Sequence, residues 1–323
     1  MWYAVPGIRP TATLMKTQRR LRVVELSPLD YYSSQGPFSD PGDEAACFGR
    51  LPKDVARLRD IVQGVVIHVF WADRYGVTVP DSRQQELQLR SVSAKLKRIR
   101  SLDGSPITRP RPPDRRLLGN CRDFSILLCS ILRHQGVPAR ARCGFATYFV
   151  PGHFEDHWVC EYWAKTRRWV MVDAQLDALQ RERLGIDFDP LDVPADRFIV
   201  GGKAWQMCRS GRYDPDMFGI SELPEVHGFW FVRGDLVRDF ASLNKVELLP
   251  WDAWGLMDRD GRLIKDSDMS LLDEVAALSQ SGNEAFAEVR NLYLGNDSLR
   301  VPRTIRSYTR SGREDVDIGG PFS

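Results

Sequence analysis

The sequence predicts an α+β fold in which N-terminal helices pack on an antiparallel β-sheet, with an extension at each end of the chain. Apolar residues recur at helical spacing in the first part of the chain, and short runs of aromatic and β-branched residues follow. With 323 residues, 43% of them hydrophobic, the chain can bury a sizeable core. We expect an N-terminal extension over 1–50, a central domain over 51–260, and a C-terminal extension with a loose tail over 261–323.

The residues before the central motif predict an irregular extension and then two helices. The first segment is rich in Ser, Gly, Pro and Asp up to Asp43, which is typical of a loop. Apolar spacing predicts a helix over 55–68, buried on one face. A second helix is expected over 81–100, capped by Asp81 or Ser82.

A capped helix that begins at Cys121 is the most informative element. Asn120 is a favoured N-cap residue, and Gly136-Val137-Pro138 ends the helix. The apolar residues between them recur on one face: Phe124, Leu127, Leu128, Ile131 and Leu132. A thiol in the first turn lies beside unpaired backbone N–H groups and the positive end of the helix dipole, and both favour the nucleophilic thiolate. The same N–H groups can stabilise an oxyanion.

A predicted β-hairpin brings a histidine and an aspartate together. Residues 158–163 and 169–172 are rich in aromatic and β-branched residues and flank a polar turn. His157 and Asp173 are equally distant from Lys165 along the chain, so a turn centred there puts them directly opposite each other. Opposed residues share a face, with Cβ atoms about 5 Å apart. A carboxylate at that distance can hold an imidazole in one tautomer, as a Cys-His-Asp arrangement requires.

Two other histidines compete with this assignment. His153 lies on the same approach to the strand, but it falls in the Pro151-Gly152 turn region, so hairpin geometry favours His157. His68 ends an apolar helical stretch and is expected to be a core residue whose hydrogen bonds are satisfied.

Four sequence blocks follow one another in the centre of the chain. They are Gly-x-Cys-x-Asp at 119–123, Leu-Arg-x-x-Gly-Val-Pro-Ala-Arg at 132–140, His-Trp-x-x-Glu at 157–161 and Trp-x-x-x-Asp at 169–173. In this order the blocks resemble the transglutaminase-like superfamily of papain-type cysteine enzymes. The resemblance implies a papain-like α+β core, with residues 51–260 as its catalytic domain.

The resemblance also implies acyl transfer through a thioester. Cys121 would be the nucleophile, His157 the general base and then acid, and Asp173 its orienting partner. We expect Asn120 and Trp158 to contact substrate. The expected partners are an acyl donor, either a small molecule or a peptide-like substrate, and in some reactions an amine acceptor. Members of the family hydrolyse amides, cross-link glutamine to amines or make amides, and the motif does not choose between these. No cofactor or metal is expected.

The sequence leaves open two alternative functions and the identity of the second oxyanion donor. A non-catalytic binding module could keep this fold and use its cleft for recognition, and a thiol protease would act on peptides in an open groove. A binding module has no physical need of Cys121, His157 and Asp173 together. For the second oxyanion donor, beside the Cys121 N–H, the sequence offers Trp71 or Gln63 without deciding between them.

The composition of the chain limits its expected partners and cellular compartment. A net charge of +2 does not predict a nucleic-acid or membrane partner. The basic stretch over 90–116 is expected to be a solvated face, because no nucleic-acid motif accompanies it. The first residues do not resemble a signal peptide, and six scattered cysteines without a Cys-x-x-Cys pair indicate reduced thiols in the cytoplasm and no structural zinc site. The sequence does not indicate an oligomeric state.

The C-terminal half carries structural signals. We expect a buried strand over 229–232, a helix over 235–245 capped by Asp235, and a hairpin turn at Asp260-Gly261. A weakly amphipathic helix is expected over 271–293, and the chain from Arg303 onward is expected to be the loose tail.

Overall fold

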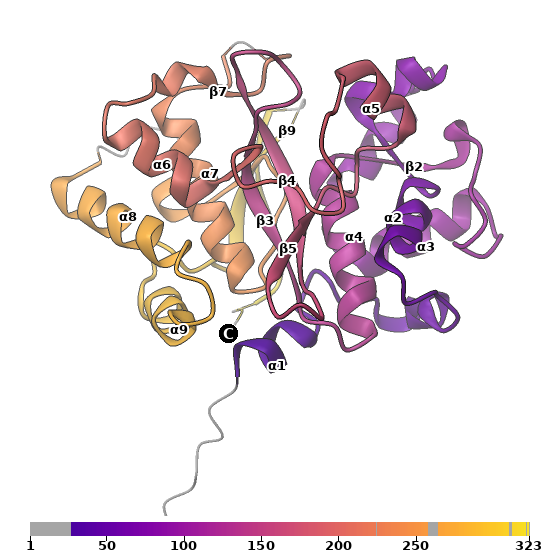
Figure 1. Ribbon diagram of the computed structural model, residues 1–323, viewed down its shortest axis with the longest axis horizontal. Helices are drawn as coiled ribbons and strands as arrows, with labels where there is room; N and C mark the ends of the chain where they lie inside the picture. Colours follow the sequence, from indigo (N-terminus) through magenta and orange to yellow (C-terminus); the bar gives the residue numbers. More distant parts are fainter. Residues whose placement is uncertain (1–26, 224, 258–263, 310–311, 321, 323) are drawn as a thin grey trace, which may run out of the picture.

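A central antiparallel sheet with helices on both sides organises the molecule (Figure 1). The computed structural model describes residues 27–323 apart from 224, 258–263, 310–311, 321 and 323. The mixture of helices and antiparallel strands agrees with the predicted α+β class. Most of the predicted N-terminal extension (1–26) and the predicted turn at Asp260-Gly261 lie outside the described residues.

The central sheet has five strands, four of them antiparallel neighbours in the order β5-β4-β3-β6. Their bounds are β3 (Ala139–Ala146), β4 (Phe154–Trp163), β5 (Trp169–Val172) and β6 (Phe198–Val200). The short β7 (Phe218–Gly219) pairs in parallel with the start of β4. Strand β3 is buried along its whole length, because helices cover both of its faces.

The helices on one side of the sheet come from the first half of the chain, apart from one short helix after β5 (Figure 1). They are α1 (Pro28–Ser33), α2 (Val55–Gln63), α3 (Val92–Leu102), α4 (Cys121–His134) and α5 (Ala178–Leu184). Short stretches of 3-10 helix lie between them at Gly42–Phe48, Val69–Tyr75, Asp81–Gln88 and Pro113–Arg115. Every residue of α4 from Cys121 to Arg133 is buried, so this helix is the core of the layer.

Both helices predicted before the motif are shorter than expected. Helix α2 stops at Gly64, and the chain then forms β1 (Val66–His68), which pairs in parallel with β2 (Leu117–Gly119). The helix expected over 81–100 is broken, because Ser91, rather than Asp81 or Ser82, caps α3 through its hydroxyl.

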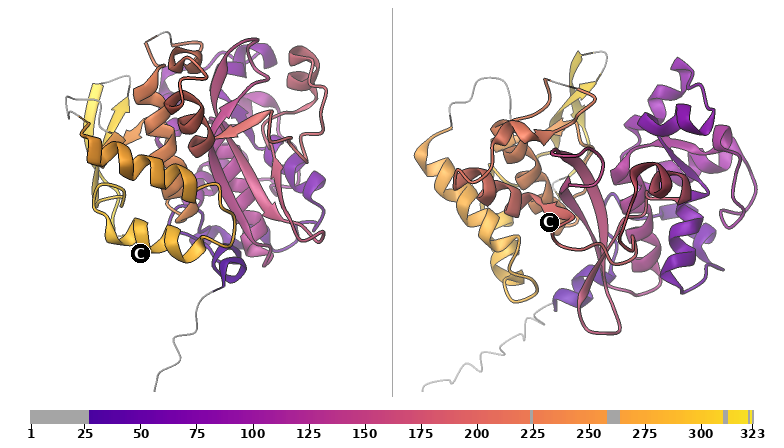
Figure 2. Two further views of the ribbon diagram at one scale, coloured as in Figure 1. Left: turned by 60° about the vertical axis from the view of Figure 1, so that its left-hand side comes forward. Right: turned by 45° about the horizontal axis from the view of Figure 1, so that its top comes forward.

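The opposite layer holds the helices of the second half (Figure 2). They are α6 (Gly201–Arg209), α7 (Phe229–Leu243), α8 (Asp266–Leu278) and α9 (Phe286–Gly295), with 3-10 turns at Pro215–Met217 and Gly255–Met257. The strand expected over 229–232 is therefore wrong. A short apolar run fits a buried strand or a buried helix equally well. Here Gly228, at φ 100°, turns the chain into α7, and Asp235 lies buried inside that helix instead of capping it.

The expected loose tail is also wrong, because most of it forms a hairpin. Strands β9 (Thr304–Thr309) and β10 (Gly312–Asp317) are antiparallel, and β9 pairs with β8 (Asp252–Ala253). Asp252 accepts hydrogen bonds from the Arg90 guanidinium at 2.7 and 2.9 Å and from the Ser307 hydroxyl at 2.9 Å. The C-terminal hairpin is thereby fixed to the first half of the chain. The single helix expected over 271–293 is likewise two helices, α8 and α9.

Buried ion pairs join α7 to the sheet. Arg142 on β3 donates two hydrogen bonds to the Asp239 carboxylate on α7, at 2.8 and 2.9 Å, and Asp239 also accepts from the Cys143 N–H at 3.0 Å. Glu161 on β4 accepts from Arg142 at 3.2 Å and from Arg140 at 2.6 Å. Both carboxylates have their charge compensated by hydrogen-bonded cations, which burial requires.

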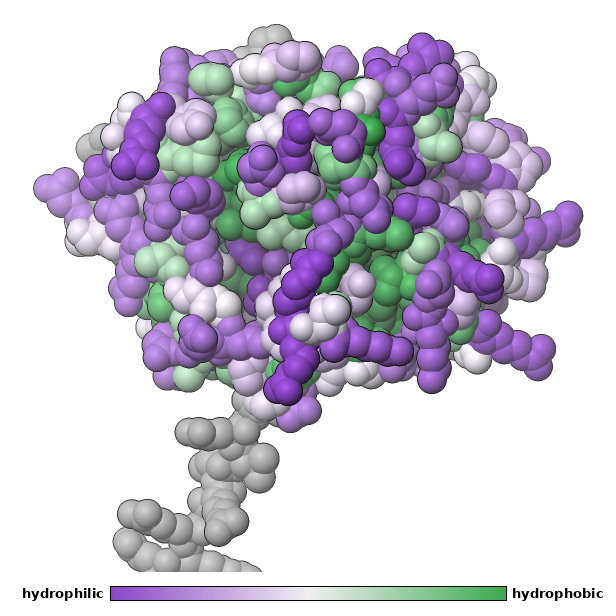
Figure 3. All heavy atoms as spheres, in the orientation of Figure 1, coloured by the Kyte–Doolittle hydropathy of each residue, from purple (hydrophilic) through white to green (hydrophobic). Residues whose placement is uncertain are grey.

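The basic stretch over 90–116 is more structural than a solvated face. Lys95 is 1% exposed and pairs with Asp123 at 2.7 Å, and Arg98 pairs with Glu86 at 2.8 Å. Hydrophilic residues cover most of the face shown in Figure 3, with smaller hydrophobic areas between them. Among the described residues, no helix is both long and apolar enough to cross a membrane.

Candidate active site

The start of α4 explains the Gly-x-Cys-x-Asp motif in steric terms. The Asn120 N–H donates to Oδ2 of Asp123 at 3.1 Å, and the Asp123 N–H donates to the Asn120 carbonyl at 2.9 Å. A Cβ atom at Gly119 would lie 2.9 Å from the same Asp123 oxygen and 3.1 Å from Cγ1 of Val66. Only glycine leaves room for the carboxylate that closes the helix start. Cys121 follows as the first helical residue.

Buried cations hold this carboxylate in place. Oδ1 of Asp123 lies 2.7 Å from Nζ of Lys95 and 3.1 Å from Nη1 of Arg122, and all three side chains are almost wholly buried. Arg122 also donates to the carbonyl oxygens of Arg90, at 2.7 Å, and Glu247, at 3.0 Å. Arg122, the residue after Cys121, therefore ties α4 to a distant part of the chain.

The histidine and the aspartate meet as predicted, but through a different register. Nε2 of His157 lies 2.8 Å from Oδ2 of Asp173. The hairpin pairs Cys160 with Val172 and Trp163 with Trp169, so its turn is centred on Thr166 instead of Lys165. This register moves each partner by two residues, which keeps the same side chains on the same face. His157 and Asp173 thus remain diagonal neighbours, and the two side chains still meet.

Asp173 is fully paired on its other sides. The Tyr148 hydroxyl donates to Oδ2 at 2.6 Å, and the N–H groups of Gln175 and Leu176 donate to Oδ1 at 2.9 and 3.3 Å. Burial alone would raise the pKa of Asp173, but the charge and hydrogen bond of His157, together with hydrogen bonds from the Tyr148 hydroxyl and the Gln175 N–H, hold it below the ordinary value. An ionised carboxylate accepts, so Nε2 of His157 carries the proton and Nδ1 is left as the basic nitrogen.

Cys121 and His157 line one cavity of about 470 Å³. Its wall is mainly apolar, formed by residues that include Phe70, Trp71, Phe149, Leu184, Ile220 and Trp251. Polar groups from several elements complete it: Asn120, Asp156, Gln175, Arg74, Arg183 and Glu222. An apolar enclosure with a few converging polar groups is typical of a small-molecule site.

The resting thiol differs from the expected thiolate. Burial raises the pKa of Cys121 well above its ordinary value, and the nearby charge of Asp156 raises it further. The backbone N–H groups of Trp158 and Arg122 lower it, but they do not outweigh burial. The helix start therefore favours the thiolate as predicted, yet its effect is smaller than the desolvation of the buried sulfur.

The remaining predicted residues fall in different places. Asn120 lies on the cavity wall, 5% exposed, and neither atom of its amide finds a partner among the described residues, so its side chain does not act as the expected cap. Trp158 is fully buried in the main core, and the residues that line the cavity do not include it. Strand alternation explains this difference, since Trp158 points away from the face that carries His157.

Of the competing histidine His153 and the two oxyanion candidates, only one lines the cavity. His153 lies 3.5 Å from Glu155 and away from the cavity lining. Gln63 donates its amide to the Ala174 carbonyl at 3.1 Å and faces a small neighbouring pocket. Trp71 lines the cavity itself.

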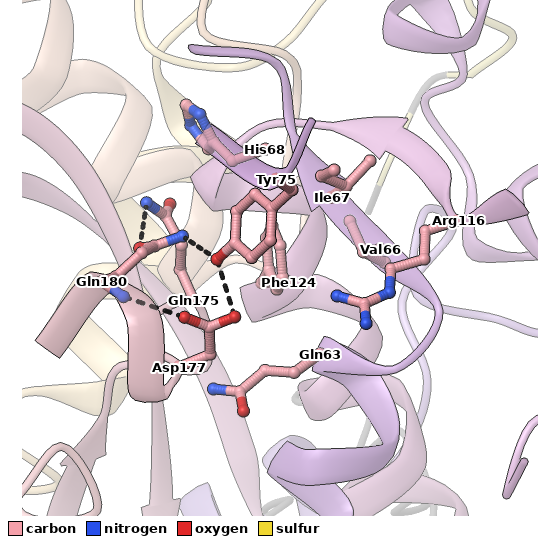
Figure 4. Close-up of a pocket in the computed structure, with 10 residues that line it drawn as sticks. All are labelled: Gln63, Val66, Ile67, His68, Tyr75, Arg116, Phe124, Gln175, Asp177 and Gln180. Carbon is pink, nitrogen blue, oxygen red and sulfur yellow. Dashed lines mark hydrogen bonds between the residues drawn. The ribbon is translucent and has the colours of Figure 1, made fainter. Parts of the chain in front are cut away.

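The small pocket next to the cavity holds the segment after Asp173 in place. Figure 4 shows the side chains of Tyr75, Asp177, Gln175 and Gln180 gathered together, while the His68 ring points away from them. The Tyr75 hydroxyl donates to Asp177 at 2.6 Å and accepts from the Gln180 amide at 3.3 Å, while Gln175 donates to Gln180 at 3.1 Å. Because Gln175 also lines the cavity, this network sets the position of one cavity wall.

His68 is the residue whose place the sequence missed. It ends β1, not a helix, and its partner in the parallel pairing is Gly119, two residues before Cys121. Its ring lines the cavity that holds Cys121, and its Nδ1 accepts a hydrogen bond from the Phe70 N–H at 3.2 Å. Tyr148 was missed as well, because nothing local in the sequence marks it as a partner of Asp173.

One cluster resembles a metal site and is better explained by a cation of the chain. Cys143, Asp156 and Asp235 offer ligand atoms within 4.8 Å of one another. The Arg238 guanidinium pairs with Asp235, however, and supplies the positive charge that a metal would bring. Cys143 is fully buried, as are Cys129 and Cys160, so these thiols pack in the protein interior.

Comparison with known proteins agrees with the sequence resemblance. A family model described as the transglutaminase-like superfamily matches residues 90–174, a range that includes Cys121, His157 and Asp173. Over residues 90–174, this chain is therefore similar to the transglutaminase-like superfamily.

Other comparisons add little. A solved structure described as a candidate cysteine protease from Cytophaga hutchinsonii is 18% identical, with a TM-score of 0.33; the match covers 56% of this chain. The chain spans about half (48%) of that protein. A comparison with curated proteins gives no significant match.

Proposed function

We propose that the protein is a cysteine-dependent acyltransferase or hydrolase that forms a thioester at Cys121. The observation that carries this proposal is the shared cavity: Cys121 at the start of α4 lines the same cavity as His157, which is hydrogen-bonded to Asp173 at 2.8 Å. A nucleophile, a base and an orienting carboxylate in one cavity are what acyl transfer requires.

Acylation would begin with general-base catalysis. Because burial keeps the Cys121 thiol protonated, Nδ1 of His157 would take its proton as the sulfur attacks the carbonyl carbon. The new S–C bond pushes the carbonyl electron pair onto oxygen. When the carbonyl re-forms, the bond to the leaving amine or alcohol breaks, and His157 returns the proton to that group. Asp173 stabilises the imidazolium while it carries the charge.

Deacylation would repeat these steps with a second nucleophile. Water or an amine gives a proton to His157 and attacks the thioester carbonyl, and the Cys121 sulfur leaves and recovers the proton. Water yields a carboxylic acid and an amine yields an amide. This chemistry needs no cofactor, since the thiol and the imidazole supply the electron pair and the proton transfers.

The cavity favours a small molecule or a short peptide-like segment as acyl donor. Its volume of about 470 Å³ falls in the range of small-molecule sites, and most of its wall is apolar. Arg74 and Arg183 on the wall would suit a donor that also carries a negative group.

Trapping of the acyl-enzyme tests the proposal. The protein is mixed with p-nitrophenyl acetate, quenched in acid and digested, and the acetylated peptide is located by mass spectrometry. We expect an acetyl group on Cys121 that is absent from Cys121→Ala, and faster p-nitrophenolate release in the wild type than in that variant. Cys47→Ala is the matched control, because Cys47 is the more exposed thiol and lies outside the cavity.

The same experiment addresses the alternatives. A non-catalytic binding module would give no acyl adduct at Cys121 and equal release rates in the wild type and Cys121→Ala. A peptide-directed thiol protease would form the adduct and also cleave denatured casein, whereas a small-molecule enzyme would not.

A further inference from the structure

His68 is a buried histidine on the cavity wall that the Cys-His-Asp triad does not use. The parallel pairing of β1 with β2 places it beside Gly119, where the chain enters the nucleophile helix. The side chain is 8% exposed and faces the cavity shared by Cys121 and His157. The charges that act on its ring come from His157, Asp123 and Asp173, which agrees with a ring that points toward the site.

The ring has one nitrogen engaged and one available. Nδ1 accepts the hydrogen bond from the Phe70 N–H, so it carries no proton, and the neutral ring must carry its proton on Nε2. Within the described residues, no group accepts a hydrogen bond from Nε2. Burial, with a smaller effect from the charge of His157, lowers the pKa of His68 to about 3. The ring therefore stays neutral near pH 7, cannot serve as a base there, and presents a fixed N–H donor.

We propose that the Nε2–H of His68 and the backbone N–H of Cys121 together form the oxyanion hole of this site. The inference rests on the proposed function. When sulfur adds to the carbonyl carbon, the displaced electron pair becomes the oxyanion, and both N–H groups donate hydrogen bonds to it without transferring a proton. The Cys121 N–H is free for this task, because the first N–H groups of a helix have no intrahelical acceptor. A neutral donor held in place before reaction stabilises such charge most effectively.

Other donors near the cavity are less suited. The Gln63 amide already donates its hydrogen bond to the Ala174 carbonyl. In the described part of the chain, no hydrogen bond orients the Asn120 amide, and the contact that holds the Trp71 ring is the Arg74 guanidinium, 5.0 Å from the ring centroid. The ring of His68 is oriented by the Phe70 N–H, so its donor direction is set before substrate arrives.

Two amide substitutions separate the two edges of the ring. In His68→Asn the side-chain amide reaches only the Nδ1 position, so it can keep the bond from Phe70 but lacks the distal donor. In His68→Gln the amide reaches the Nε2 position and restores that donor. Both variants are compared with wild type and with Trp71→Phe in acetylation by p-nitrophenyl acetate and in alkylation of Cys121 by iodoacetamide. Alkylation displaces iodide and forms no oxyanion, so it reports on the thiol alone.

We expect His68→Asn to slow acetylation of Cys121 by roughly 100-fold or more while alkylation stays within about twofold of wild type. His68→Gln should recover most of the loss, and Trp71→Phe should slow acetylation far less than His68→Asn. The proposal is overturned if His68→Asn acetylates normally, if His68→Gln is as slow as His68→Asn, or if alkylation falls in parallel with acetylation. Wild-type protein that is alkylated at Cys121 but never acetylated would refute the proposed function itself.

Discussion

The hydroxyl of Tyr148 donates a hydrogen bond to Oδ2 of Asp173 at 2.6 Å, on the same oxygen that His157 contacts. Tyr148 lies on the segment after β3, and its ring also meets the His157 ring edge to face, at 6.0 Å between centroids. One residue therefore limits the movement of both partners of the pair, and it does so from a separate strand connection.

Tyr148→Phe should lower the free energy of unfolding at pH 7 and weaken its dependence on pH in the acid range. The folded pKa of Asp173 lies below its unfolded value of about 3.9, so the ionised carboxylate stabilises the fold above that pH, and this contribution is lost as the pH falls through the folded pKa. Loss of a hydrogen bond to a charged group should cost about 1.5–3 kcal/mol at pH 7. In urea unfolding, the difference in free energy of unfolding between Tyr148→Phe and the wild type should become smaller as the pH is lowered. Tyr293→Phe, which also removes a buried hydroxyl, should show no such narrowing.

Asp173→Asn should abolish most activity while keeping the fold. An amide can donate to Nε2 of His157, which moves the imidazole proton to Nδ1, so that this nitrogen can no longer take the Cys121 proton as the proposed mechanism requires. We expect acetylation of Cys121 to fall by up to roughly 10⁴-fold. The rate of p-nitrophenolate release measures this, with Asp192→Asn, an exposed carboxylate paired to Arg168, as control. A loss below tenfold would mean that Asp173 does not set the tautomer.

Asp156→Asn should make the nucleophile more acidic. Burial is the larger cause of the raised pKa of Cys121, and the charge of Asp156 is the next. The pKa of Asp156 is itself raised well above its ordinary value by burial and by the neighbouring Asp235, so its charge develops only as the pH rises. Removal of that charge favours the thiolate, so the alkaline part of the iodoacetamide alkylation profile should move to lower pH. Glu222→Gln, on the same cavity wall but not among the groups that shift the thiol, should leave the alkylation profile in place.

Asp239→Ala should destabilise the protein strongly. It leaves the Arg142 guanidinium buried without its bidentate partner and removes the acceptor of the Cys143 N–H. Breaking such a pair typically costs about 3–5 kcal/mol, measured here by urea unfolding. By contrast, Asp187→Ala breaks an exposed pair with Arg197 and should cost less than about 1 kcal/mol. An equal loss of unfolding free energy in the two variants would mean that the buried pair contributes no more to stability than the exposed pair.

Gly119→Ala should disturb the nucleophile helix. The new methyl group would press on the Asp123 carboxylate, which cannot retreat because Lys95 and Arg122 hold its other oxygen. Overpacking of this kind costs about 1–3 kcal/mol, seen as a lower midpoint of thermal unfolding. Gly104→Ala is a matched control, since no described atom lies within 4 Å of the place that its methyl group would take. A Gly119→Ala protein as stable as that control would contradict the steric account.

The contact of His157 with Asp173 and the helix that begins at Cys121 could be predicted from the sequence, because their signals are local. Helical spacing and the flanking stop marked the start of α4, and the even parity of the hairpin kept His157 and Asp173 on one face although the register was wrong. The position of the turn could not be predicted from the sequence. Arg167 adopts a left-handed conformation, at φ 61°, which is uncommon for a residue other than glycine. A two-residue error was therefore harmless to the site.

The rest of the site depends on contacts between distant segments. His68 reaches the cavity only because β1 pairs with β2, about fifty residues further along the chain, and a three-residue strand leaves almost no pattern to detect. Its apolar neighbours suggested a continued helix instead. The apolar run that begins α7 was equally ambiguous, since helix and buried strand differ there only through Gly228.

The contacts of Arg122 carry a consequence for how the protein is made. A chain is synthesised from its N-terminus, and the Glu247 carbonyl that accepts from this guanidinium lies 125 residues downstream. Until that segment leaves the ribosome, the guanidinium beside Cys121 has Asp123 and the Arg90 carbonyl as partners but lacks this acceptor, and a buried N–H group without an acceptor costs about 1–3 kcal/mol. A nascent chain that already contains Cys121, His157 and Asp173 therefore still lacks one of the contacts that fix helix α4, and this contact forms only after Glu247 has been synthesised.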